Sequence, residues 1–217
     1  MENSKSEKRA KLLDVAQGVI RKQGVKKTTL DDIAEASGMA ATSIYYYFDS
    51  KNDLLRGVID SVIEKTLDRV RAAIDAAGTP EEKLVASWKV LFATARESGF
   101  HLSLNADARP EIALLAEDLL KNFEQRYKVM IHKIISDGIE RRELAVEDIY
   151  LTVSVLANVF LGMVNSNVNE AHCRMIEERV EKLGSLFMNG LRKDKRTGAA
   201  DPRRTVCLPP KDTVGSV

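Results

Sequence analysis

Residues 41–51 hold the side chains best suited to chemistry, because hydroxyls, phenols and a lysine follow one another there. If Ile44, Tyr47 and Phe48 point into a core, the residues between them face outward, since a helix repeats every 3.6 residues. Small residues at a helix tip followed by tyrosines suit close approach to DNA, where the tip reaches base edges and phenols meet phosphates. The same spacing also fits an ordinary helical hairpin with half-buried tyrosines. The outward set consists of Ala41, Thr42, Ser43, Tyr45 and Tyr46.

Two short helices are needed to position these side chains. Leu30 and Ile33 line one face of a helix that begins after Thr29, whose hydroxyl can cap it together with Asp32. Gly38 is the left-handed residue expected to end that helix, and a second apolar stripe begins soon after it. Two short helices joined by a tight glycine turn form a helix-turn-helix.

Residues 31–55 read DDIAEASGMAATSIYYYFDSKNDLL. This run closely resembles the DNA-binding signature of the TetR family of bacterial transcriptional regulators, in which a glycine turn, a Leu/Ile-Tyr-x-Tyr/His-Phe block and a Ser-Lys-x-x-Leu helix start recur together. The match covers residues 10 to 60 approximately, and beyond it the resemblance is one of architecture. The family usually has Ser, Lys and Gly where this chain has Ala40, Ala41 and Thr42, a departure that bears on the operator sequence rather than on the binding mode.

The resemblance implies that a homodimer places two copies of the Ala41 to Phe48 helix in successive major grooves of a palindromic double-stranded DNA operator. Thr42 and Ser43 are then the candidates for base contact, with Ala41 at the tip. Lys51 begins the next helix beside free backbone amides, which attract a phosphate, and the family's lysine at this position touches the operator backbone. The other expected phosphate contacts are Thr29, Tyr45, Tyr46 and Tyr47.

The charge balance fits a protein that binds DNA through a local basic surface. The 33 Lys and Arg residues almost balance 32 Asp and Glu residues, which argues against a nonspecific coat of nucleic acid. Basic residues outnumber acidic ones before residue 30, although a solvated amphipathic helix would show the same excess. The rival function is a helical protein–protein interaction module without sequence-specific DNA binding. The basic residues are Lys5, Lys8, Arg9, Lys11, Arg21, Lys22, Lys26 and Lys27.

Enzymatic, metal and membrane functions find little support. The chain has three histidines and no Gly-rich phosphate loop, nucleophile elbow or paired-carboxylate motif, so we expect neither catalysis nor a cofactor. His172 and Cys173 are adjacent and would diverge by about 100° on a helix, which disfavours a shared metal. No apolar run reaches the roughly 20 residues that span a bilayer, and the polar N-terminus lacks a signal-peptide core. These features predict a cytoplasmic protein.

The predicted fold is all-α and has three parts. Residues 1–55 form a three-helix DNA-binding head with the helix-turn-helix, residues 56–192 a helical effector-binding and dimerisation domain, and residues 193–217 a disordered tail rich in Pro, Gly and charge. Residues 1 to about 7 are expected to fray. A stripe from Leu54 to Ile74 predicts a helix about 40 Å long that joins the head to the second domain. A ligand that tilts this helix would move the reading helix.

The second domain is expected to hold the dimer interface. Helices are predicted at 80–98, from residue 110 to about 140, at 147–165 and at 170–191. The third of these is apolar on nearly every side and must be covered, either by a second subunit or as an internal helix of a monomer. The family resemblance implies a four-helix dimer interface. The last helix is expected to help through Ile176, Val180, Leu183 and Phe187.

Aromatic and thioether side chains gather where the helices of the second domain should converge. In a helical domain such a set either fills a core or walls an apolar cavity with a few orienting polar groups. The family resemblance implies a pocket for a small-molecule effector, which these side chains would make partly apolar. The candidate lining residues are Trp88, Phe92, His101, Asn105, Phe123, Tyr127, Met130 and Asn158.

Overall fold

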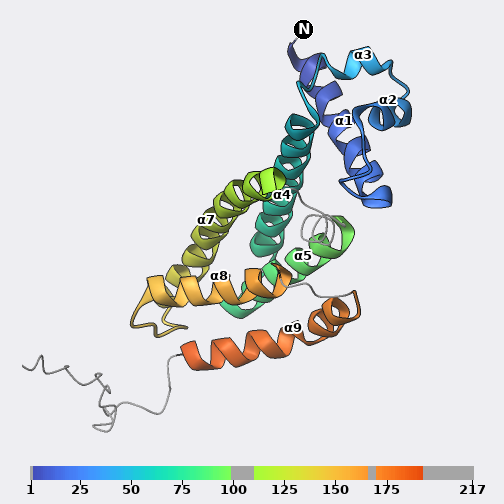
Figure 1. The fold of residues 1–217 in the computed structure, drawn as a ribbon. Helices are drawn as coiled ribbons and strands as arrows, with labels where there is room; N and C mark the ends of the chain where they lie inside the picture. Colours follow the sequence, from blue (N-terminus) through green and yellow to red (C-terminus); the bar gives the residue numbers. More distant parts are fainter. Residues whose placement is uncertain (1, 99–109, 166–169, 193–217) are drawn as a thin grey trace, which may run out of the picture.

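The computed structural model describes residues 2–98, 110–165 and 170–192, and these form an all-α fold, as predicted (Figure 1). The described ranges contain no strand, and a single antiparallel bridge joins Leu144 to Arg192. The helices are α1 (Glu2–Gln23), α2 (Leu30–Ser37), α3 (Ala41–Ile44), α4 (Lys51–Ala76), α5 (Pro80–Ser98), α7 (Pro110–Glu140), α8 (Ile149–Asn165) and α9 (Glu170–Leu191). The expected tail at 193–217 lies outside the described residues.

The first three helices and the start of α4 pack around one apolar core and form the head. Ile20 of α1, Ile33 of α2 and Ile44 of α3 are wholly buried in it. Phe48 and Leu54 close the same core from the segment that enters α4. Each such side chain contributes about 1.5–3 kcal/mol through burial, so packing rather than helix propensity stabilises these short helices.

α1 begins at Glu2, so the expectation that the first seven residues fray is wrong for residues 2–7. The reason is a pair of contacts with aromatic rings that lie far along the chain. The Lys5 ammonium is 4.3 Å from the centroid of the Tyr46 ring, and the Arg9 guanidinium is 5.0 Å from that of Phe48. Cation–π contacts of this kind contribute about 0.5–1 kcal/mol each at exposed sites. They hold the first turns of α1 against the segment that follows α3.

α4 leaves the head and enters the rest of the molecule as one continuous helix (Figure 1). Its 26 residues span about 39 Å at 1.5 Å per residue, so the predicted long helix is confirmed. The remaining helices, α5, α7, α8 and α9, form the body together with the C-terminal part of α4. Leu54 and Leu55 are buried in the head, whereas Leu67 and Val70 are buried in the body, where α4 packs on α5 and α7. A rotation of one end of α4 therefore moves both cores.

Polar contacts also join α1 of the head, and α4 itself, to the other helices of the body. Arg21 Nη1 donates to the backbone carbonyl of Glu97 at 3.3 Å, and the Glu97 carboxylate accepts from Arg69 Nη1 at 2.7 Å. Arg56 pairs with Asp118 of α7 at 3.3 Å. The paired side chains are about half exposed or more, so each ion pair contributes only about 0.2–1 kcal/mol.

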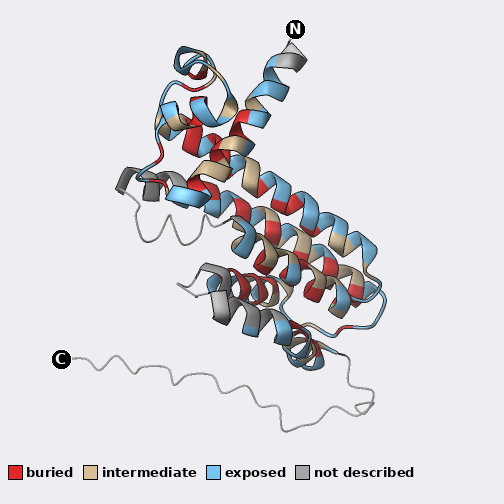
Figure 2. Cartoon of the chain, turned by 90° about the vertical axis from the view of Figure 1, so that its right-hand side faces the viewer, coloured by how far each residue is buried: buried red, intermediate tan, exposed pale blue. Residues whose placement is uncertain are grey.

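Aromatic side chains fill the core of the body, where α5, α7, α8 and α9 meet; buried positions lie on the facing sides of these helices (Figure 2). The Trp88 ring stacks on Phe160 with the ring centroids 3.4 Å apart and the planes 6° apart. α9 approaches α5 closely at Gly184, where an added Cβ would lie 2.3 Å from Val85 Cγ2. The body core is therefore tightly packed.

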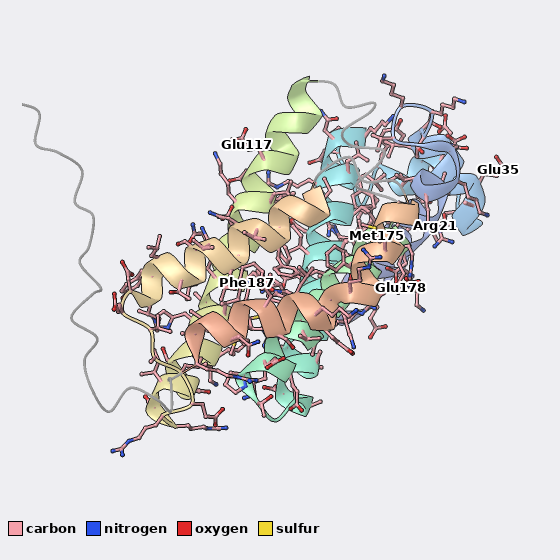
Figure 3. All side chains as sticks on the ribbon, turned by 90° about the horizontal axis from the view of Figure 1, so that it is seen from below. Arg21, Glu35, Glu117, Met175, Glu178 and Phe187 are labelled. Carbon is pink, nitrogen blue, oxygen red and sulfur yellow. The ribbon has the colours of Figure 1, made fainter. Side chains whose placement is uncertain are left out.

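α8 and α9 run side by side in opposite directions, at the end of the body remote from the head (Figures 1 and 3). α8 begins two residues later than predicted because Asp148 caps it, its carboxylate accepting the Leu151 N–H at 2.9 Å. Leu151 and Val155 of α8 are exposed, as are Met175 and Leu186 of α9. Although α8 is strongly apolar, none of the described helices combines the length and hydropathy needed to cross a bilayer.

The residues of α9 that we expected at the dimer interface belong instead to the core of the protomer. Val180 is wholly buried, and Leu183 and Phe187 are partly buried against the core, with Phe187 lying between α8 and α9 (Figure 3). The Phe187 ring contacts Trp88 at 6.1 Å and Phe160 at 6.5 Å between centroids. The prediction is wrong because α9 uses this face to cover α5. The side chain of Ile176 lies outside those described.

Candidate DNA-binding surface

The segment expected to read DNA, residues 41–48, is called the reading segment, and its regular helix is shorter than expected. We predicted one helix from Ala41 to Phe48, but α3 ends at Ile44 and residues 45–47 form tight turns. The Tyr46 and Tyr47 amides donate to the carbonyls three residues before them, at 3.3 and 2.9 Å. These tighter bonds replace the α-helical pattern. Phe48 thereby enters the head core while the tyrosines remain at the surface.

The outward-facing residues lie where the helical spacing predicted them. Ala41 and Thr42 are exposed, and Ser43 is half-buried. Tyr45 is 57% exposed and Tyr46 is 66% exposed, which is unusual for aromatic residues beside a complete core. Tyr47 is half-buried, packs against the head core and meets the edge of the Tyr46 ring at 5.1 Å. The Tyr47 side chain is therefore less accessible to a phosphate than the side chains of Tyr45 and Tyr46.

Thr29 forms the predicted cap of α2. Its hydroxyl accepts the Asp32 N–H at 3.1 Å, and the Asp32 carboxylate accepts the Thr29 N–H at 2.7 Å. Hydrogen bonds from Thr29 hold the pKa of Asp32 below its ordinary value, with smaller contributions from Gln23 and the Lys51 charge. Gly38 ends α2 with a φ of 67°, in the left-handed region that favours glycine. The helix-turn-helix is thus fixed at both ends of α2.

Lys51 is held more firmly than expected, because its Nζ donates to the backbone carbonyl of Lys26 at 3.2 Å. The free amides predicted beside it are partly occupied. Ser50 Oγ accepts the Asp53 N–H at 3.1 Å, and the Asp53 carboxylate accepts the Asp49 N–H at 3.2 Å. The start of α4 is thus already capped, and a phosphate there would depend on the Lys51 charge more than on open amides.

Two aromatic contacts of α1 were missed by the sequence reasoning. Lys5 and Arg9 were counted only as part of a basic excess, yet each lies over a ring of the reading segment. Their separation of four residues, one helical turn, was the available signal. It was hidden because the partner rings, Tyr46 and Phe48, lie some forty residues further along the chain.

The candidate effector residues divide into three groups. Trp88, Phe92, Phe123 and Tyr127 are buried, and Met130 is partly buried against the same core. Asn158 is exposed and does not converge with them, because it lies about 200° around α8 from Phe160. His101 and Asn105 lie outside the described residues.

The buried group carries its own polar contacts. The Tyr127 hydroxyl and Ser87 Oγ lie 2.9 Å apart, and burial raises the pKa of Tyr127 far above its ordinary value. Trp88 Nε1 is buried and meets no acceptor of good geometry among the described residues, although it lies near enough to Tyr127 to oppose that rise slightly. Trp88 therefore offers a buried hydrogen-bond donor.

No group of three His, Cys, Asp or Glu residues suited to a metal ion occurs in the described part of the chain. The side chains of His172 and Cys173, for which no metal was predicted, are outside that part.

Comparison with known proteins identifies the helix-turn-helix. A family model described as bacterial regulatory proteins, tetR family, matches residues 12–58, which extend from α1 into α4. The HTH-type transcriptional repressor KstR2 of Rhodococcus jostii (strain RHA1) is 28% identical over 151 residues, covering 67% of this chain and 74% of the repressor. Residues 12–58 form a TetR-family DNA-binding domain. TetR-family proteins of this kind are DNA-binding transcriptional regulators, and the relatives are regulators rather than enzymes.

Solved structures of TetR-family and related regulators share the fold over most of the chain. A transcriptional regulator from Cytophaga hutchinsonii ATCC 33406 superposes with a TM-score of 0.71 at 20% identity, covering 84% of this chain and 97% of the other. The transcriptional regulator FadR of Bacillus subtilis, solved in complex with stearoyl-CoA, gives a TM-score of 0.61 at 21% identity, with coverages of 80% and 95%. The similarity extends through the helices of the body as well as the head.

Proposed function

We propose that this TetR-family regulator is a repressor that binds a palindromic operator as a homodimer and is released by a small molecule. One observation carries the proposal. The reading segment exposes Thr42, Tyr45 and Tyr46 while Ile44 and Phe48, from the same segment, are wholly buried. Burial of Ile44 and Phe48 fixes the positions of the residues on the outer side. That side presents hydroxyls and phenols without carboxylates, which suits contact with a polyanion. The division into residues 1–55, 56–192 and 193–217, and action in the cytoplasm, belong to the same proposal.

Each exposed group has an assigned role in this proposal. Thr42 and Ser43 contact base edges in the major groove, with Ala41 allowing close approach. Tyr45 and Tyr46 donate their phenol hydroxyls to phosphates on either side. Thr29, Tyr47 and Lys51 supply further phosphate contacts at the edge of the groove, and these fix register without reading sequence.

Exposed apolar side chains on α8 and α9 support the homodimer. Leu151 and Val155 lie along one side of α8 together with Asn158, and Met175 and Leu186 lie along one side of α9 with Arg179 and Lys182 between them. Two protomers related by a two-fold axis would cover both faces at once with a four-helix interface. The two heads would then reach successive major grooves, about 34–36 Å apart.

The effector proposal rests on the aromatic core of the body. Trp88, Phe160 and Tyr127 pack closely, so a ligand must separate them to enter. An effector with a flat or aliphatic body and a hydrogen-bond acceptor would replace those contacts and meet the Trp88 N–H. The stearoyl-CoA bound by the Bacillus subtilis FadR gives an example of a partly apolar ligand in this fold.

Release requires that the effector favours one head spacing over another. Separation of α5 from α8 would displace α4, which packs on α5 over much of its length. The Arg21 contact with the Glu97 carbonyl would shift with it, because that contact joins the head to the body, and so would the Arg56–Asp118 pair between the start of α4 and α7. The two heads would then no longer fit two grooves of one operator.

The proposal is tested by fluorescence anisotropy with a duplex from the promoter region of the chain's own gene, against a scrambled duplex of equal length. We expect a preference of roughly 10³-fold or more for the promoter duplex at physiological salt. Equal affinity for both duplexes would contradict sequence-specific regulation of that promoter, and absence of binding to either would favour the protein-interaction function.

Thr42→Ala should relax base preference while leaving affinity for mismatched duplexes almost unchanged. Removal of the hydroxyl would delete one hydrogen bond to a base edge, worth about 0.5–1.5 kcal/mol of discrimination at that base pair. A saturation library of single base changes in the operator measures the loss position by position. If the profile is the same as that of the wild type, the base contact lies elsewhere in the segment.

Lys51→Ala should weaken binding to every sequence alike. Loss of one phosphate contact flattens the slope of log affinity against log salt by about 1 for each copy in the dimer. Titrations between 50 and 200 mM salt provide the slope. Lys133→Ala, which removes an exposed lysine from α7, is the matched control and should leave both the affinity and the salt slope unchanged. A loss confined to one operator would show that Lys51 reads sequence instead.

A further inference from the structure

The first turns of α1 lie against the reading segment and carry two cations, Lys5 and Arg9, that contact its aromatic rings. In Figure 1 the N-terminal end of α1 lies beside α3. Lys5 is exposed with its ammonium 4.3 Å from the centroid of the Tyr46 ring, and Tyr46 is itself one of the most exposed aromatic residues. No carboxylate of the described residues pairs with Lys5 or with Arg9, whereas Asp14, further along α1, pairs with Lys65.

Arg9 fixes the position of α1 relative to this surface. Its half-buried guanidinium lies 5.0 Å from the centroid of the Phe48 ring, on the side toward α4. At Gly57 of α4 an added Cβ would lie 3.1 Å from Arg9 Nη2 and 2.9 Å from Leu13 Cδ2. Arg9 is therefore wedged between Phe48 and α4, and Lys5, one helical turn earlier, is carried to a fixed place beside Tyr46.

We propose that Lys5 is an additional DNA-binding residue, which contacts a backbone phosphate next to the one reached by Tyr46. This inference rests on the proposed operator binding and adds a contact from outside the helix-turn-helix. Without DNA, the face of the Tyr46 ring holds the ammonium. With DNA, a phosphate beside the Tyr46 hydroxyl attracts the same charge more strongly than the ring does, because the phosphate carries a full negative charge.

The Tyr46 ring limits the rotamers of Lys5 before DNA arrives. A lysine on an exposed helix end otherwise loses up to about 2 kcal/mol of side-chain entropy when it is ordered. Because the ring has already ordered the chain in part, less of that cost remains for the complex. The positions of Tyr46 and Lys5 should therefore be energetically coupled in DNA binding.

The test measures the salt dependence of affinity for the promoter duplex between 50 and 200 mM salt. Lys5→Gln should reduce the slope of log affinity against log salt by about 0.9 for each copy, or about 1.8 in a dimer. The advantage of the wild type over the variant should therefore shrink roughly 12-fold across this fourfold range of salt. Lys5→Arg should keep the wild-type slope. Lys133→Gln on α7 removes the same charge far from the head and should also keep it.

A double-mutant cycle tests whether the Tyr46 ring positions the Lys5 ammonium for DNA binding or whether Lys5 acts independently of the ring. Tyr46→Phe keeps the ring, so Lys5→Gln should retain its full effect in that background, whereas in Tyr46→Leu the effect should be smaller. If the wild type binds the duplex and Lys5→Gln has the wild-type slope, the inference is overturned while operator binding stands. If the wild type does not bind the duplex, the proposed function fails first. If Lys5→Gln has the same effect on DNA binding in the Tyr46→Phe and Tyr46→Leu backgrounds, the Tyr46 ring does not position Lys5.

Discussion

Leu186→Glu should convert the protein to a monomer and weaken operator binding roughly 10²- to 10⁴-fold, because simultaneous engagement of two half-sites is lost. Leu186 is 70% exposed in the protomer, on the outer side of α9. In a two-fold interface the substitution buries two carboxylates without partners, a cost of several kcal/mol for the dimer. The protomer itself keeps its core. Sedimentation velocity gives the assembly state, and anisotropy with the promoter duplex gives the affinity.

Val129→Glu provides the matched control for this prediction. Val129 is 69% exposed, almost the same as Leu186, but it lies on α7 rather than on the α8 and α9 face. The control variant should remain a dimer and bind the duplex as the wild type does. If Val129→Glu dissociates the protein and Leu186→Glu leaves it dimeric, the interface lies on α7. Circular dichroism should give the same helical content for both variants.

Trp88→Ala should destabilise the protein by about 3–5 kcal/mol, because it removes the largest side chain in the body core and leaves a cavity against Phe160. For a chain of this length the melting temperature should fall by roughly 6–20 °C. Trp88→Phe should cost less than Trp88→Ala, since it keeps a ring in the stack and deletes a buried N–H that has no acceptor among the described residues. Thermal denaturation followed by circular dichroism measures both.

Two further measurements show whether the effect is local to the body. Tyr150→Ala removes an aromatic residue that is 75% exposed and should change stability by about 0.5 kcal/mol or less. Below its melting temperature, Trp88→Ala should still bind the promoter duplex, because the core of the head has its own buried residues. An equal loss of stability in Trp88→Ala and Tyr150→Ala would contradict the packing described here.

The local order of residues in the head was sufficient to predict its helix-turn-helix. Thr29 and Asp32 form the cap of α2, and Gly38 ends it, because capping depends on groups only three residues apart and on the freedom of glycine at positive φ. The division between buried Ile44 and Phe48 and exposed Thr42 follows in the same way from helical period. The resemblance to the TetR family over these residues is confirmed by the match at 12–58.

In the body, the sequence predicted which segments are helical but not which neighbour covers each apolar face. On α9 the spacing predicted one apolar stripe, and Val180, Leu183 and Phe187 of that stripe do pack into the core, but the spacing could not tell whether α5 or a second subunit covers them. Asn158 was wrongly grouped with the aromatic core because α8 is apolar on nearly every side, so its spacing did not single out the buried face. Only the packed structure decides this, because the choice depends on which neighbouring helix is available.

The sequence by itself determined the helices, their caps and the outward residues of the reading segment, since these depend on contacts within a few residues. The tertiary structure decided where regular helix gives way to turns after Ile44, and it placed Lys5 over Tyr46 and Arg9 over Phe48. The two cation–π contacts join residues some forty positions apart. Local propensity carries no information about such pairs, because their energy arises only after the head has folded.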